Sequence, residues 1–276
     1  MMINKIKLLI SVPLVLLTVI IIYSLLFGKL FPYSPVIIGF SANETDHAVI
    51  YIQNGAEFSD SDKIDPLFHD IENFFEMTFK RKPRIFIFRD VKSFCRRSVI
   101  KARFCSFYNG DIVIAPWALE EARRGEISLE IYLKHELSHS IIHQQSGLFR
   151  ASNFPKWLHE GTAMFVAGQR GTTFYPSKEK TRQVIREGNF LHPKDYLTKR
   201  EKRIKLNVDH RIGFIYSEFA CIVDFLIEKY GRERLLLYVG TIIKNGDADR
   251  AFQEIYGLEF NECIQAFRES VLQNSD

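Results

Sequence analysis

The stretch of sequence that decides the fold covers residues 128–145 and reads SLEIYLKHELSHSIIHQQ. Its apolar residues recur every four positions, at Leu129, Leu133, Leu137 and Ile141. This period predicts an amphipathic helix that buries one stripe against the rest of the protein. The helix contains the pattern H-E-x-x-H, whose two histidines lie on the same helical face. His135 and His139 could therefore bind one metal ion, and Glu136 could reach a water molecule bound to that ion.

A second motif, further along the chain, supplies a candidate for the third ligand. Residues 155–163 read PKWLHEGTA, with proline where the first turn of a helix favours it. Catalytic zinc usually binds three protein side chains and keeps one position for water. Glu160 would complete a His-His-Glu set. The neighbouring His159 is the alternative ligand, but adjacent helical side chains point about 100° apart, so only one of the two can face the ion.

The two motifs together, H-E-L-S-H and P-K-W-L-H-E-G-T-A, resemble the gluzincin metallopeptidases, specifically the peptidase MA-like group. A looser similarity extends over residues 84–272. The resemblance implies Zn²⁺ as the cofactor, bound by His135, His139 and Glu160, and a thermolysin-like core of helices and a small sheet. It also implies an endopeptidase that acts on a peptide or protein substrate, with Glu136 activating the zinc-bound water.

The resemblance implies two further roles and reveals one departure. Tyr216 would donate a hydrogen bond to the developing oxyanion, with His210 as the reserve. The strand at residues 111–115 would align an extended substrate, through Ile112, Val113 and Ile114. Thermolysin-type enzymes carry an acid four residues after the third ligand, where this chain has Met164, so another group must orient the ligand histidine. The alternative function is a catalytically silent domain that binds peptides or assembly partners at the membrane.

The N-terminal residues contain a separate apolar segment. Residues 8–28 contain no charged side chain and are mostly Leu, Ile and Val. A helix of this length is about 31 Å long, close to the thickness of a bilayer core. Lys5 and Lys7 precede it, so the positive-inside rule puts the N-terminus in the cytoplasm and the catalytic domain outside. We expect a single-pass membrane anchor. The alternative is a cleaved signal peptide, whose apolar region is usually shorter.

These patterns predict an α+β fold in three parts. Residues 1–29 would form a cytoplasmic stub and transmembrane anchor, residues 30–47 a linker, and residues 48–276 the metallopeptidase domain. Short strands are predicted at residues 48–52, 84–88, 103–108 and 111–115. The last two flank Asn-Gly, the strongest short signal for a hairpin. The chain is predicted to be helical after residue 128, so a small mixed sheet precedes a mostly helical C-terminal half.

The composition is that of an ordinary globular protein. The 276 residues are 46% hydrophobic and 25% charged, and the net charge of +4 gives no reason to expect nucleic-acid binding. The segment 177–211 is more basic, with eleven Lys or Arg and five Asp or Glu. It is interpreted as a solvated insertion, or alternatively as a lid or a patch for anionic lipid or acidic substrate. In an exported domain Cys95 and Cys105 would be the pair best placed to form a disulfide, whereas Cys221 and Cys263 are expected in the core.

Overall fold

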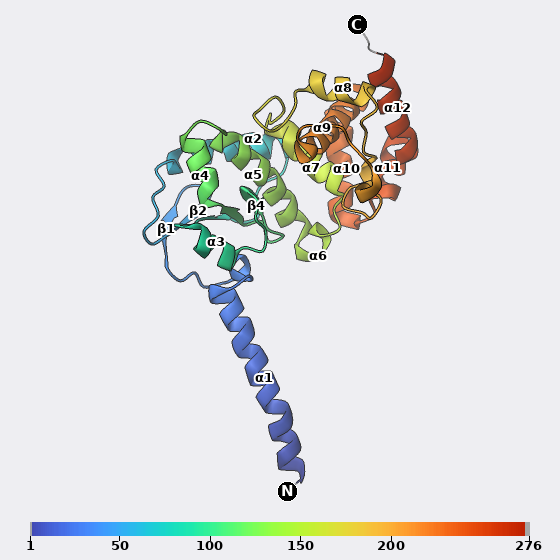
Figure 1. The fold of residues 1–276 in the computed structure, drawn as a ribbon. Coiled ribbons are helices and arrows are strands. Elements are labelled where there is room, and N and C mark those ends of the chain that lie inside the picture. The colour runs from blue at the N-terminus through green and yellow to red at the C-terminus, as the bar shows by residue number, and fades with distance from the viewer. Residues whose placement is uncertain (1, 274–276) are drawn as a thin grey trace.

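The computed structural model describes residues 2–273, with side chains from residue 13 onward. In Figure 1 helix α1 (Met2–Phe27) projects from a body that has two halves. One half contains a small sheet with flanking helices, and the other is built of helices. Helix α5 (Leu129–Ser146) runs between the two halves. The fold is therefore mostly helical with one small mixed sheet.

The prediction of a transmembrane anchor is wrong. Within the described part of the chain, no helix combines the length and the apolar character needed to cross a membrane. The fold class with a transmembrane helix over residues 8–28, and the single-pass location inferred from it, are corrected accordingly.

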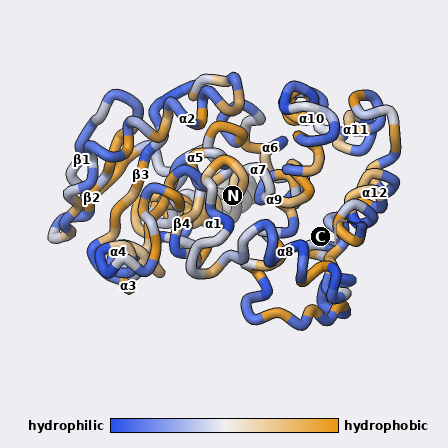
Figure 2. The backbone as a smooth tube through the Cα atoms, turned by 90° about the horizontal axis from the view of Figure 1, so that it is seen from above, coloured by the Kyte–Doolittle hydropathy of each residue, from blue (hydrophilic) through white to orange (hydrophobic). Residues whose placement is uncertain are grey.

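The sheet has five strands in the order β1-β2-β3-β5-β4. Their bounds are β1 Phe40–Glu44, β2 Val49–Gln53, β3 Arg84–Ile87, β4 Phe104–Ser106 and β5 Ile112–Ile114. The strands β2, β3 and β5 run parallel, while β1 and β4 are antiparallel edge strands. Inner parallel strands are covered on both faces, which explains why β3 and β5 are almost entirely apolar. In Figure 2 β3 is largely hydrophobic, in contrast to the hydrophilic α8 (Lys178–Arg186).

The helices fall into two groups around α5. Those in the half with the sheet are α2 Asp65–Phe75, α3 Val91–Arg97 and α4 Pro116–Arg123. Those in the helical half include α6 Leu148–Ala151, α7 Lys156–Val166, α9 Arg211–Tyr230, α10 Arg232–Asn245, α11 Ala248–Tyr256 and α12 Phe260–Gln273. The predicted helix α5 is present, capped by the Ser128 hydroxyl, which accepts a hydrogen bond from the Ile131 N–H at 3.3 Å. It is buried on almost every side, not along one stripe, because α2, α7 and β4 all pack against it.

The predicted hairpin is present and connects β4 to β5 through Asn109 and Gly110. Gly110 has a φ of +83°, and a Cβ at this position would lie 2.6 Å from the Cγ atom of Gln144. The Gly110 carbonyl accepts a hydrogen bond from the Ser140 hydroxyl at 2.5 Å. Ser140 and Gln144 both belong to α5. The turn therefore fixes the sheet against the helix that carries the H-E-x-x-H motif.

Residues 30–47, predicted as a linker, contribute to the folded body through β1 and a short 3₁₀ helix at Phe31–Tyr33. Phe31 is buried, and its ring centroid lies 5.2 Å from that of Phe86 in β3. The Arg84 guanidinium donates hydrogen bonds to the Ser34 carbonyl at 2.5 Å and the Pro32 carbonyl at 2.9 Å. The segment after α1 is thus held to the sheet by the pairing of β1 with β2, by apolar packing and by hydrogen bonds such as those from Arg84.

The four cysteines are all free thiols. Cys95 lies in α3 and Cys105 in β4, so the disulfide considered for this pair is not formed. Cys221 and Cys263 are buried in α9 and α12, as expected for core residues.

The buried carboxylate of Asp111 forms ion pairs with two arginines in the half that contains the sheet. Its side chain is 0% exposed and lies 2.7 Å from the Arg81 guanidinium and 2.6 Å from that of Arg84. Asn109 donates a further hydrogen bond to it at 2.8 Å. Removing one partner of a buried ion pair leaves the other charge without compensation. The resulting loss of folding stability is far larger than for an exposed ion pair.

We expect Asp111→Ala to lower the free energy of unfolding by about 3–5 kcal/mol. The matched control is Asp70→Ala, whose carboxylate lies 2.7 Å from Lys134 but is 56% exposed. The control should cost about 1 kcal/mol or less, because water screens exposed pairs. Urea denaturation of both variants measures the difference. Equal losses would contradict the importance assigned to the Asp111 network.

Candidate metal centre

Three side chains from two helices converge on one point. His135 and His139 lie one turn apart on α5, and Glu160 lies on α7. The Nε2 atoms of the histidines are 3.0 Å apart. The Glu160 Oε2 atom lies 3.3 Å from Nε2 of His135 and 3.4 Å from Nε2 of His139. These three residues form a group that could hold a metal ion.

The spacing and chemistry of this group fit zinc. Nitrogen and oxygen ligands lie about 2.0–2.1 Å from zinc in a tetrahedral site, which puts neighbouring ligand atoms about 3.3–3.4 Å apart. The separations of Glu160 Oε2 from the two imidazoles match that value. Two imidazoles and one carboxylate also form a ligand set that catalytic zinc sites use.

The electrostatics of the three groups also favour a cation. Burial lowers the pKa of His135, but the hydrogen bond and charge of Glu160 and the charge of Glu136 outweigh it, so the net shift is upward. Burial by itself would raise the pKa of Glu160, but the two imidazoles bring it well below the usual range. The carboxylate is therefore ionised inside a buried site, where it needs a positive partner.

Glu136 faces the same site without belonging to the ligand group. Its Oε2 atom accepts a hydrogen bond from the backbone N–H of Ser106 in β4 at 2.6 Å. Burial raises its pKa, although the nearby imidazoles lower it in part. A carboxylate with a raised pKa is well suited to exchange protons near neutral pH. The sequence alone did not indicate the contact with Ser106, because it joins residues that are thirty positions apart.

The two other histidines near the site are buried and neutral. The ring of His159 stacks on that of His139 with centroids 3.9 Å apart, and burial brings its pKa well below the usual value. His159, the alternative ligand, is not a member of the converging group. Burial also lowers the pKa of His143 to about 3, and its Nδ1 atom lies 3.2 Å from the Ser106 hydroxyl.

Tyr216 lies beside the ligand group at the start of α9. Its ring is nearly parallel to that of His135, at an angle of 11° and with centroids 6.4 Å apart. Its hydroxyl accepts a hydrogen bond from the Tyr196 hydroxyl at 3.3 Å. Burial raises the pKa of Tyr216 well above its ordinary value, so the phenol keeps its proton. His210, the reserve candidate, caps α9 instead by accepting from the Gly213 N–H at 3.0 Å.

The expectation that Ile112, Val113 and Ile114 align the substrate is wrong. They form β5, which is fully buried and pairs with β3 on one side and β4 on the other. An inner strand has no free edge to which a peptide could add. The free edge belongs to β4, where the backbones of Arg103 and Phe107 bond inward and Ser106 points outward to Glu136.

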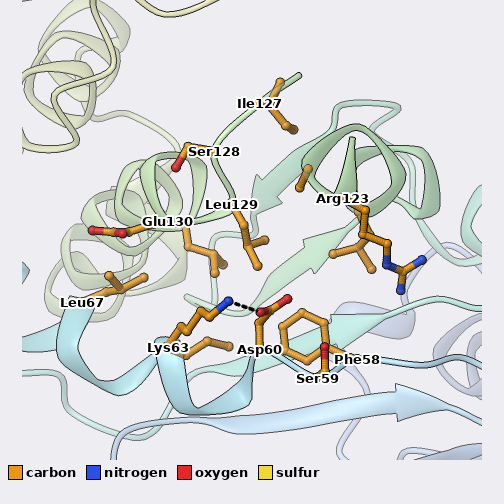
Figure 3. A pocket seen from close by; sticks show the side chains of 14 residues that line it. Phe58, Ser59, Asp60, Lys63, Leu67, Arg123, Ile127, Ser128, Leu129 and Glu130 are labelled. Carbon is orange, nitrogen blue, oxygen red and sulfur yellow. Dashed lines mark hydrogen bonds and ion pairs between the residues drawn. The ribbon is translucent and has the colours of Figure 1, made fainter. Parts of the chain in front are cut away.

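A cavity of about 650 Å³ gives access to this group. Its lining includes the three candidate ligands, Glu136, residues 103–107, and Gln169, Tyr175 and Tyr216. A second cavity of about 520 Å³ lies at the other end of α5, between that helix, α2 and α4 (Figure 3). There Asp60 pairs with Lys63 and Arg123 donates to the Glu57 carbonyl, so these charges already have partners. The candidate ligands and Glu136 line the larger of these two cavities.

The position of Glu160 depends on how closely α7 approaches α9. Gly161 follows Glu160, and a Cβ at this position would lie 2.7 Å from the Phe219 carbonyl oxygen and 3.0 Å from the Val223 side chain. Backbone atoms cannot move aside as a flexible side chain can. Only glycine therefore allows α7 to pack this closely and bring the carboxylate to α5.

Comparison with known proteins agrees with this arrangement. The sequence model of the Peptidase MA superfamily matches residues 130–273, just over half of the chain. The chain belongs to the peptidase MA superfamily. No curated protein matches it. The match begins in α5 and ends in α12, so this peptidase MA region contains the candidate ligands and Tyr216, while the sheet precedes it. The family resemblance is confirmed at the level of the superfamily.

The basic segment 177–211 packs onto this peptidase MA region through internal contacts. Lys178 pairs with Glu228 of α9 at 2.5 Å, and Arg182 donates to the Ser270 carbonyl of α12 at 3.0 Å. The same segment carries Tyr196 to the hydroxyl of Tyr216. Part of its positive charge is thus used to attach it beside the candidate metal centre.

We expect Gly161→Ala to lower the free energy of unfolding by about 1–3 kcal/mol, because the added methyl group overpacks the contact between α7 and α9. It should also weaken metal binding, since Glu160 moves with α7. The control is Gly240→Ala in α10, where a Cβ would meet no atom within 4 Å. The control should stabilise the protein by up to about 1 kcal/mol. Chemical denaturation and metal titration of the two variants test this, and unchanged values for Gly161→Ala would contradict it.

Proposed function

We propose that the protein is a zinc-dependent endopeptidase that hydrolyses peptide bonds with water activated by Glu136. The observation that carries this proposal is the convergence of His135, His139 and Glu160, with Glu136 buried beside them. Membership of the peptidase MA superfamily supports the same reaction class. The remaining cavity-lining groups are suited to distinct steps of hydrolysis.

The two imidazoles and the carboxylate would hold zinc and leave one position open. When bound there, zinc supplies a Lewis acid that polarises the scissile carbonyl and makes water more acidic. The chain's own contribution is to keep His135, His139 and Glu160 in place from two rigid helices. A site that is built on helices is held more precisely than one built on loops.

Glu136 would act as general base and then as general acid. One of its oxygens is fixed by the Ser106 N–H at 2.6 Å, which orients the carboxylate toward the cavity. The carboxylate would take a proton from the attacking water and deliver it to the leaving amine. Such positioned proton transfer typically contributes about 10²–10⁴-fold to the rate.

Tyr216 would stabilise the negative charge that develops on the carbonyl oxygen. Its phenol remains protonated because it is buried, and a protonated phenol can donate a hydrogen bond to an oxyanion. The Tyr196 hydroxyl donates to its oxygen, which leaves the proton of Tyr216 free to point into the cavity.

The substrate would lie as an extended peptide along the free edge of β4. The Phe107 N–H bonds to the Asp111 carbonyl and the Arg103 carbonyl accepts from Ala115, so these residues face inward. Backbone groups alternate in direction along a strand, and the polar groups of Phe104 therefore face the cavity. They could pair with a substrate by strand addition.

We expect Glu136→Gln to retain zinc but to lose at least about 10²-fold in casein hydrolysis, because the amide cannot accept the proton of water. Its side-chain oxygen can still accept the hydrogen bond of Ser106. His135→Ala should lose both zinc and activity. Zinc stoichiometry and a casein assay on the purified chain, with and without a chelator, measure both properties.

The same experiment separates hydrolysis from a silent binding domain. A parent protein that binds one zinc ion and does not cleave casein or other unfolded proteins would support the silent domain. Equal cleavage by the parent and by Glu136→Gln would refute the proposed base. A parent protein without zinc would refute the metal centre.

We expect Tyr216→Phe to lower kcat by about 10²-fold with little change in KM, because the donor acts mainly on the transition state. The control is Tyr256→Phe, whose hydroxyl is buried in the helical half and has no hydrogen-bond partner among the described residues. Steady-state kinetics on a peptide substrate compare the two. A loss confined to KM would show that Tyr216 binds the substrate and does not stabilise the oxyanion.

A further inference from the structure

The second ring nitrogen of His135, Nδ1, is a buried polar atom without a hydrogen-bond partner among the described residues. Nε2 of His135 faces the ligand group, while its Nδ1 atom is buried without a hydrogen-bond partner in the structure. Metal-binding histidines nearly always donate the hydrogen on their second nitrogen to a carboxylate, a carbonyl or water, which fixes the tautomer and the ring. The position four residues after Glu160 is Met164, which is buried and apolar. The acceptor must therefore come from elsewhere in the chain.

Gln169 offers that acceptor. Gln169 is 1% exposed and lines the same cavity as His135, and its Oε1 atom is buried without a hydrogen-bond partner in the part of the chain that the structure describes. Nδ1 of His135 and Oε1 of Gln169 are thus a buried donor and a buried acceptor on the lining of one cavity, and neither has another partner among residues 2–273. A donor and an acceptor that are both buried and both unsatisfied each cost free energy until they pair.

The backbone of Gln169 is fixed directly after the helix that carries Glu160. Its N–H donates to the Met164 carbonyl at 3.1 Å, and its carbonyl accepts from the Thr172 hydroxyl at 2.8 Å. Gly168 has a φ of +60° and reverses the chain at this point. The carboxamide is therefore held at a set distance from α7, on the same segment as the third ligand.

We infer that Gln169 is the positioning residue of the metal centre, with Oε1 accepting the hydrogen of His135 Nδ1. This interaction keeps the lone pair of His135 Nε2 free for zinc and fixes the orientation of the ring. It replaces the acid that is absent at Met164 with a neutral acceptor, which costs less to bury than a carboxylate. The inference rests on the proposed zinc site and adds a residue to it.

The test compares zinc affinity, measured by chelator competition on the full chain, among three variants. Gln169→Leu removes the acceptor and should weaken zinc binding about 10–100-fold. Gln169→Glu keeps an acceptor oxygen and should stay within about threefold of the parent. The matched control is Gln53→Leu, which removes a buried carboxamide that donates to the Ser93 hydroxyl at 2.6 Å; neither residue lines the cavity. The control should leave zinc affinity unchanged.

The thermal unfolding of the zinc-free proteins separates positioning from a structural role. Gln169→Leu leaves the His135 Nδ1–H without an acceptor, and Gln53→Leu breaks the bond to Ser93, so the two zinc-free variants should lose a similar amount of stability. Loss of zinc affinity in both variants would overturn the inference, because the affinity would then follow the loss of stability. An unchanged zinc affinity of Gln169→Leu, with a parent that binds one zinc ion, would overturn it as well. A parent that binds no zinc would overturn the metal centre and this inference together. Selective loss in Gln169→Leu, with recovery in Gln169→Glu, supports it.

Discussion

The arrangement of this protein depends on how closely α7 packs against α9. At Gly161 the two backbones are so near that a single added carbon would lie 2.7 Å from the Phe219 carbonyl oxygen. This contact sets the depth of α7 in the helical half and thereby the distance of Glu160 from the two histidines of α5. Two buried imidazoles and a half-buried carboxylate can share one point only if that distance is right, because each would otherwise remain without a partner. The chemistry of the site is therefore a consequence of helix packing.

The sheet forms the opposite wall of the site, and α5 connects the sheet to the helical half. The hairpin turn is fixed to α5 through the Ser140 hydroxyl and Gly110, and the edge strand fixes Glu136 through the Ser106 N–H. The ligands thus come from the helical elements, while the orientation of the base comes from the edge of the sheet. The match to the Peptidase MA superfamily begins in α5. It therefore does not include the sheet, but it does contain the three candidate ligands.

Much of the local structure could be predicted, and most errors concern long-range relations. The helix, the hairpin and the grouping of His135 with His139 follow from spacings within a few residues. The role given to Ile112–Ile114 was wrong because the order of strands in a sheet is not encoded in any one strand, and the run is buried between two neighbours. The membrane anchor was wrong because hydropathy over residues 8–28 was taken as sufficient for a membrane-spanning helix.

The sequence by itself determined the pair of histidines, the adjacent glutamate and a second motif with a carboxylate, since an α-helix places residues four apart on one face regardless of context. Only the tertiary structure decided which of His159 and Glu160 faces the pair, which strand has the free edge, and that Gln169 lines the same cavity as His135. These outcomes depend on contacts between segments far apart in the chain. Such contacts are fixed by the packing of whole helices and strands, and no local pattern of residues predicts them.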